Sequence, residues 1–223
     1  MLAFVVAMVI YLIVYGWESW RAPAAWKRFR KSLGLRDDPT ATDRSVGTYE
    51  GRSLRAWVDV ELVGGDDGDG REIPFTILEV DAAVPDDFYV YFRRRGLLSV
   101  FFRVRRGGGY KQLAYGMEPE LELGRPRLDK RFEILGSAGD ELREALTHPR
   151  AQSHLEELVS YRRELHIETG AIRLEWRGRP ANGDKLIKSA SNLVGLAQLL
   201  DDSSEVVLEV EQSEVAQEEV ARW

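Results

Sequence analysis

Cysteine is absent from this chain of 223 residues. Its absence excludes disulfide bridges, thiolate catalysis and cysteine-ligated zinc, and it suits a reducing compartment such as the cytoplasm. Histidine is scarce, because His148, His154 and His166 are the only three, and none of the spacings typical of histidine metal ligands occurs. We therefore expect no metal site and no cofactor.

Motifs of the common catalytic centres are missing as well. The serine-hydrolase pattern Gly-x-Ser-x-Gly does not occur. The glycine run 107–109 lacks the Gly-Lys-Ser/Thr ending of a phosphate-binding loop, and the acidic run 66–72 does not have the residue order of a calcium-binding EF-hand. We assign no catalytic residue and expect a protein without catalytic activity. An enzyme or a small-ligand-binding domain of unknown reaction remains the alternative.

A long uncharged run is present instead, at the start of the chain. Residues 2–17 (LAFVVAMVIYLIVYGW) carry no charge. Sixteen residues of helix span about 24 Å, which is less than the ~30 Å hydrocarbon core, but amphipathic rings such as those of Trp17 and Trp20 suit the headgroup region. Five basic residues follow almost at once: Arg21, Lys27, Arg28, Arg30 and Lys31. This order predicts a single-pass anchor in the cell's inner membrane with the following domain on the cytoplasmic side.

Two other interpretations of the apolar run stay open. A secretory signal needs positive charge before its apolar core and small residues at its cleavage site. Only Met1 precedes the run, and Trp17-Glu18-Ser19-Trp20 ends it, so the signal peptide is the weaker interpretation. A buried core helix is the second. An envelope protein with its domain outside is the corresponding alternative for the location.

Charge is distributed very unevenly along the chain. Residues 18–36 hold six basic residues against one acid, a net charge of +5. Residues 88–117 contain seven basic residues and no acid, and residues 201–223 hold eight acids against one arginine, a net charge of −7. The overall net charge of −6 argues against a general nucleic-acid binder.

The acid-free stretch 88–117 supplies a candidate basic binding face. Residues 95–102 superficially resemble an RNA-recognition signature, but Leu97 and Ser99 occupy the positions where aromatic rings stack on bases. We therefore expect no nucleic-acid partner and consider the anionic inner leaflet a better ligand. The structural alternative is an arginine-rich sheet face that pairs with Glu118, Glu120, Glu122 or the acidic tail. The candidate residues are Arg93, Arg95, Arg103, Arg105 and Lys111.

The residue pattern predicts strands first and helices later, which is typical of an α+β fold. Alternating apolar residues predict strands over 48–63, 73–80, 88–94 and 97–105, and shorter ones over 121–123 and 132–135. Helical spacing then begins near Asp140, and His148-Pro149 divides it into a short and a longer helix. A hairpin around Gly170 and a helix from about Gly183 to Leu200 complete the domain.

Four segments follow from this pattern. Residues 1–20 form a transmembrane anchor, 21–46 a basic collar and linker, and 47–200 a soluble α+β domain. That domain is expected to be a mainly antiparallel sheet with two or three helices in its C-terminal half. Residues 201–223 form an acidic tail, which we expect to be mobile or a frayed helix.

Short motifs give a family resemblance. The anchor, Tyr49-Glu50-Gly51-Arg52 at the start of a strand, Leu128-Asp129-Lys130-Arg131-Phe132, and the closing helix, hairpin and helix resemble uncharacterised bacterial single-pass membrane proteins. The likeness covers most of residues 47–200. It implies a soluble α+β domain on a membrane tether, and it assigns no catalytic residue.

Together these features favour a membrane-tethered cytoplasmic domain that binds a protein partner or the anionic membrane surface. Membrane lipid is one expected partner, and a protein of unknown identity is the other. The residues expected at the membrane are Trp17, Trp20, Arg21, Lys27, Arg28, Arg30 and Lys31.

The predicted orientation has a direct test. Alkaline phosphatase fused to the C-terminus of the full chain should be inactive, because this enzyme needs an oxidising exterior to form its disulfides. Activity of the fusion in intact cells is the measurement. An active fusion would place the domain outside.

Overall fold

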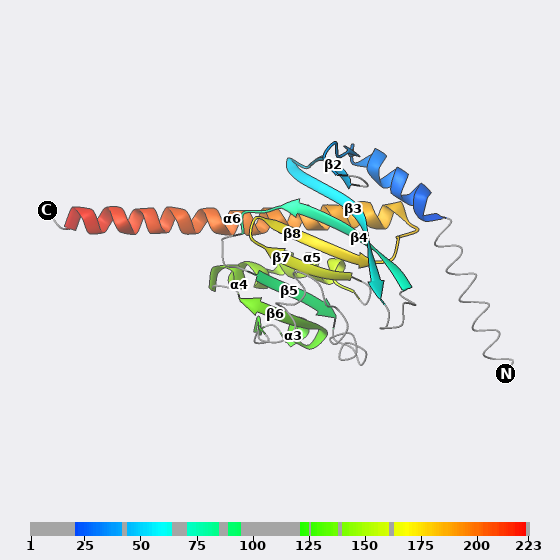
Figure 1. Cartoon of the computed structure of the whole chain (residues 1–223). Helices are drawn as coiled ribbons and strands as arrows, with labels where there is room; N and C mark the ends of the chain where they lie inside the picture. The colour runs from blue at the N-terminus through cyan, green and yellow to red at the C-terminus, as the bar shows by residue number, and fades with distance from the viewer. Residues whose placement is uncertain are drawn as a thin grey trace. The chain divides into compact units, whose positions relative to one another are not determined.

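The structure is a computed structural model, and it describes these parts of the chain: residues 21–41, 44–63, 71–84, 89–94, 121–124, 126–137, 140–160 and 163–221. A helix covers residues 21–32. The labelled elements (Figure 1) are β1 (Arg36–Asp37), β2 (Arg44–Tyr49), β3 (Arg52–Val63), β4 (Arg71–Asp81), β5 (Tyr89–Arg94), α3 (Pro126–Arg131), β6 (Phe132–Ser137), α4 (Asp140–Thr147), α5 (Pro149–Leu158), β7 (Arg163–Glu168), β8 (Ala171–Arg177) and α6 (Gly183–Ala221).

The strands form one eight-stranded sheet in the order β1-β2-β3-β4-β8-β7-β5-β6. The pairs β1–β2, β2–β3, β5–β6 and β5–β7 are antiparallel. The predicted α+β class with a mainly antiparallel sheet is thus confirmed. The chain divides into two compact units, Met1–Leu78 with Glu175–Ser191 (unit 1) and Glu79–Leu174 with Asn192–Trp223 (unit 2).

In unit 1, helix 21–32 is part of the folded structure. Phe29 is fully buried, and Leu33 and Leu35 beyond the helix are only 6% and 7% exposed. The helix ends in a Schellman motif, in which Gly34 has φ +65° and the Leu35 N–H donates to the Arg30 carbonyl at 2.9 Å. The structure differs here from the expected collar and linker over 21–46, because apolar residues at helical spacing bury one side of this segment.

The next difference lies between β2 and β3. The pattern predicted one strand over 48–63, but the chain reverses at Glu50 and Gly51, and Tyr49 pairs with Arg52. Both turn residues have positive φ, 50° for Glu50 and 82° for Gly51, as a two-residue type I′ hairpin requires. Glutamate is an unusual residue in this conformation, so its presence gave little indication of the turn.

In unit 2, β5, β7 and α5 follow the predicted pattern. Val90 and Phe92 of β5 are fully buried, as are Leu165 and Ile167 of β7. His148 is the N-cap of α5, its Nδ1 accepts from the Arg150 N–H at 3.3 Å, and Pro149 opens the helix. The predicted division of the helical region at His148-Pro149 is confirmed, as is the hairpin of β7 and β8 around Gly170.

Two segments differ from their predictions. Residues 126–131, between the two short strands predicted over 121–123 and 132–135, form α3, while residues 121–123 form no strand. The last helix, α6, does not end near Leu200 but continues to Ala221, a length of 39 residues. Its buried residues recur at helical spacing from Leu186 to Leu200. The acidic sequence beyond Leu200, for which we expected mobility or fraying, therefore continues a helix that packing has already nucleated.

Among the helices of the described residues, none combines the length and the apolar composition needed to cross a membrane. The predicted anchor (1–20) lies outside the described residues. The predicted strand over 97–105 lies outside them as well.

Burial of Phe29 gives a stability prediction. Phe29→Ala should lower the free energy of unfolding by about 3–5 kcal/mol, because it removes a fully buried ring. Lys27→Ala, on the exposed side of the same helix, should change it by less than about 0.5 kcal/mol. Urea unfolding of the full chain in mild detergent, followed by circular dichroism, measures both. Similar small losses for the two variants would show that helix 21–32 does not belong to the folded unit.

Candidate functional site

Helix 21–32 has one apolar side that is packed against the rest of unit 1. Ala22, Ala25 and Phe29 recur at helical spacing, and their exposed fractions are 3%, 7% and 0%. Gly183, at the start of α6, lies so near that a Cβ atom there would be 2.8 Å from the Ala25 carbonyl oxygen. Only glycine permits this close approach, so the helix is held in a fixed rotation about its own axis.

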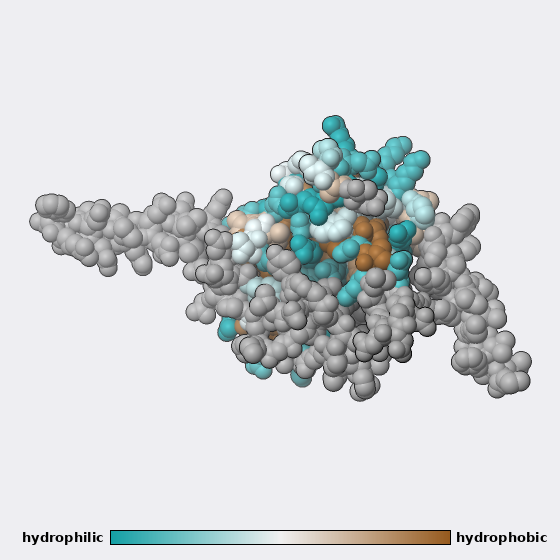
Figure 2. Space-filling view, in the orientation of Figure 1, coloured by the Kyte–Doolittle hydropathy of each residue, from teal (hydrophilic) through white to brown (hydrophobic). Residues whose placement is uncertain are grey.

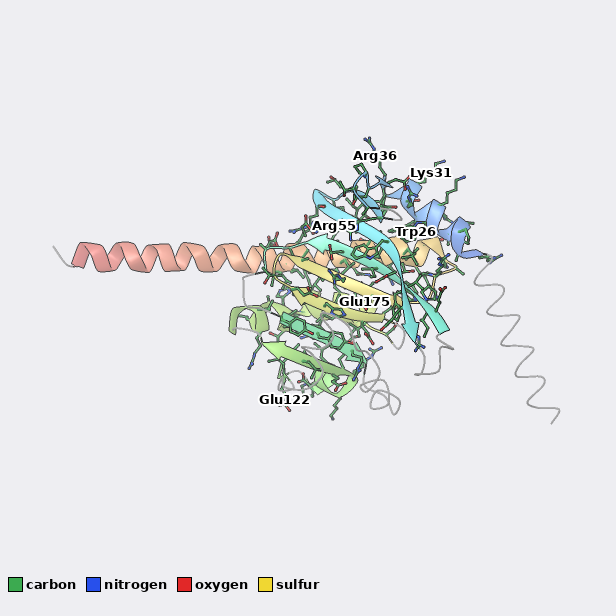
Figure 3. All side chains as sticks on the ribbon, in the orientation of Figure 1. Trp26, Lys31, Arg36, Arg55, Glu122 and Glu175 are labelled. Carbon is green, nitrogen blue, oxygen red and sulfur yellow. The ribbon has the colours of Figure 1, made fainter. Side chains whose placement is uncertain are left out.

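The other side of helix 21–32 carries an exposed cationic face, defined here as Arg21, Lys27, Arg28 and Lys31. At 100° per residue these four positions span about 120° of the helix, and their centre lies about 130° from that of the buried residues. Exposed Arg36 follows in β1, and Figure 3 shows the Lys31 and Arg36 side chains directed away from the sheet. The packing of the apolar side thus determines where the charges point.

Figure 2 shows the hydropathy of the same region in space-filling form. Hydrophilic residues gather along the upper edge of the view, where Figure 1 places helix 21–32 and β2. The cationic face therefore belongs to a polar part of the unit 1 surface.

Not all the basic residues near this helix contribute equally to its exposed positive charge. Arg30 donates to Asp37 Oδ1 at 2.5 Å, and its side chain is only 28% exposed. Arg28 pairs with Asp184 at 2.9 Å, but both side chains are more than 60% exposed, so water screens this pair. Beside them, hydrogen bonds from the Thr40 hydroxyl and N–H hold the pKa of Asp38 below its usual range. Arg30 is thus mainly structural, and Arg28 remains accessible.

The structure places the other residues predicted from the sequence as follows. Arg93 lies in β5 at 7% exposure, where it donates to Glu133 Oε2 of β6 at 2.5 Å. It therefore does not belong to an exposed basic face. The remaining candidates lie outside the described residues: Trp17, Trp20, Arg95, Arg103, Arg105 and Lys111.

Unit 2 contains a second charged region on its strands. Besides the pair of Arg93 and Glu133, the Arg173 guanidinium donates twice to Glu79 Oε2, at 2.8 and 2.7 Å. Each of these buried or partly buried arginines faces a carboxylate, so their charges stabilise one another across neighbouring strands.

His166 of β7 is a buried histidine of unit 2. It is 6% exposed, its ring meets the Tyr91 ring edge-on at 4.6 Å, and its Nδ1 lies 3.9 Å from Glu168 Oε1. An imidazole and a carboxylate are donor types that bind zinc, but protein zinc sites use at least three such ligands. Glu164 of the same strand offers a further carboxylate oxygen within 4.8 Å of a His166 ring nitrogen, so His166 lies among several possible ligand groups.

Sequence reasoning missed the basic residues that follow β8. Residues 177–188 hold four basic residues against one acid, Asp184. The contacts of Gly183 with Ala25 and of Asp184 with Arg28 bring this segment beside helix 21–32. The local charge excess was visible in the sequence, but the two segments are about 150 residues apart, and no pattern relates them.

Comparison with known proteins assigns this chain to no family. No family model matches the chain, and no curated protein matches it. Among solved structures it is similar to the crystal structure of the mycobacterial trehalose monomycolate transport factor A, TtfA, with 14% identity and a TM-score of 0.49 over 79% of this chain and 93% of that one. A likeness this distant says nothing about the function of this chain.

The pair of Arg93 and Glu133 gives a test of its structural role. Glu133→Gln should cost about 3–5 kcal/mol of unfolding free energy, because it leaves the Arg93 charge buried and uncompensated. The double variant Arg93→Met/Glu133→Leu should recover most of that loss, because no charge is then buried. Exposed Glu122→Gln is the control. Urea unfolding measures all three, and a double variant no more stable than Glu133→Gln would contradict the account.

Proposed function

We propose that this chain is a single-pass inner-membrane protein whose cytoplasmic domain is held against the anionic leaflet by the cationic face of helix 21–32. One observation carries the proposal. The four exposed basic residues lie on the side of the helix opposite its buried residues, only four residues after the uncharged run 2–17 ends.

The uncharged run 2–17 is the proposed anchor, and the packing of helix 21–32 fixes the direction of the charges. A flexible basic linker would let the domain diffuse at the end of a tether. A packed helix instead presents its charges in one direction, and each Lys or Arg near an anionic surface contributes about 1 kcal/mol. Four such residues therefore favour contact with the surface by several kcal/mol at low ionic strength, less at higher salt.

The internal pairing of the charged residues of unit 2 favours surface binding over the enzyme alternative. Arg93 and Arg173 form ion pairs with Glu133 and Glu79 inside the unit. On helix 21–32, by contrast, Lys27 and Lys31 extend into solvent. Compared with Arg93 and Arg173, the exposed cations of helix 21–32 are therefore better placed to meet a ligand.

A single-cysteine label tests the proposal, since the chain has no cysteine of its own. Ala24→Cys places a nitroxide at the centre of the cationic face without removing a charge, and Ala24 is exposed. With the full chain in vesicles, the label should be less accessible to a water-soluble nickel complex when the lipid is phosphatidylcholine with phosphatidylglycerol than when it is phosphatidylcholine alone. A label at exposed Ser53→Cys, beside the β2–β3 turn, should remain accessible in both.

Charge variants make the same experiment specific. Lys27→Gln/Lys31→Gln should remove about 2 kcal/mol of surface attraction and much of the lipid-dependent protection at position 24. Lys130→Gln/Arg143→Gln, which removes two exposed charges of unit 2, should leave that protection unchanged. Equal accessibility of the position 24 label in both lipids would contradict the proposal.

A further inference from the structure

The segment that joins β8 to α6, together with the first turn of α6, is a second feature of unit 1 with a net positive charge. Arg179 and Lys185 are exposed, and they lie on either side of the helix N-cap Asn182. The acid of this segment, Asp184, is paired with Arg28. We call residues 178–185 the basic turn.

The basic turn is held in place at both ends. At its start, the Gly178 N–H donates to the Pro74 carbonyl at 2.7 Å, and the Gly178 carbonyl accepts from Thr76 Oγ1 at 2.9 Å. At its end, Asn182 Oδ1 accepts from the Asp184 N–H at 2.9 Å and caps α6. Hydrogen bonds to β4 and within the N-terminus of α6 thus hold both ends of the short segment that contains Arg179.

The basic turn also lies directly beside helix 21–32. Gly183 is near enough that an added Cβ would lie 2.8 Å from the Ala25 carbonyl oxygen and 3.5 Å from Arg28 Cβ. The ion pair of Arg28 and Asp184, at 2.9 Å, joins the two segments a second time. Figure 1 shows α6 beginning beside this helix. The cations of the turn and those of the helix therefore belong to neighbouring parts of one surface.

We propose that the basic turn is a second contact for anionic phospholipid headgroups, so that the domain is fixed at two points against the leaflet. This inference rests on the proposed function of helix 21–32. A single helix on a surface leaves the domain free to roll about the helix axis. A second cationic contact to one side of that axis removes this rotation, and the guanidinium of Arg179 suits a phosphate because it donates two parallel hydrogen bonds.

The test uses three labels in the full chain reconstituted in vesicles of phosphatidylcholine with or without phosphatidylglycerol. Ala181→Cys reports on the turn, Ala24→Cys on helix 21–32, and Ser53→Cys on the β2–β3 end of unit 1. Anionic lipid should reduce the nickel-complex accessibility of the labels at 181 and 24 and leave that at 53 unchanged. Arg179→Gln/Lys185→Gln should then raise accessibility at 181 about fivefold or more while largely preserving protection at 24.

The outcomes separate the two proposals. Protection at 24 without protection at 181 overturns the second contact and leaves the proposed function in place. Protection at neither site overturns both. Protection at 181 that survives Arg179→Gln/Lys185→Gln, but not Lys27→Gln/Lys31→Gln, also overturns the inference, because the turn would then only follow the helix to the surface. Lys130→Gln/Arg143→Gln is the matched control, and circular dichroism confirms that each variant is folded.

Discussion

The packing of helix 21–32 against the rest of unit 1 is the constraint that determines where the cationic face of this protein points. Phe29 is fully buried, and the close approach of Gly183 to Ala25 leaves no space for a side chain between the helix and the start of α6. Because the apolar side of the helix is fixed, the direction of its charges is fixed too. The residues shortly after the uncharged run 2–17 are therefore part of the folded domain. The cationic face moves together with that domain.

Two kinds of charge in the molecule have different consequences. Arginines of unit 2 face carboxylates on neighbouring strands, as Arg93 faces Glu133, and such pairs specify how strands meet. The exposed cations of helix 21–32 contribute little to stability, because water screens them. In the proposed function, their energetic effect appears when they approach an anionic surface. Burial, more than the number of charges in a segment, thus separates structural residues from those that are open to a ligand.

The sequence was sufficient for much of the fold. Alternation and Gly170 predicted the β7–β8 hairpin, and Pro149 marked the start of α5. It was insufficient where a residue adopts a conformation unusual for its type, as Glu50 does at φ 50°. It also failed where a partner is distant: Arg93 was expected on an exposed face because Glu133, forty residues away, cannot be recognised as its neighbour from periodicity. The basic residues of helix 21–32 were found, but the packing that orients them and the neighbouring turn required the structure.

The central claim is that the domain lies directly on the anionic leaflet. Neutron reflectometry of the full chain in a supported bilayer measures the distance between the headgroups and the protein layer. With phosphatidylglycerol present at low salt, the account predicts protein density that adjoins the headgroups. It also predicts that a hydrated gap opens in pure phosphatidylcholine or at high salt, where the attraction is screened. The same separation under all three conditions would contradict it.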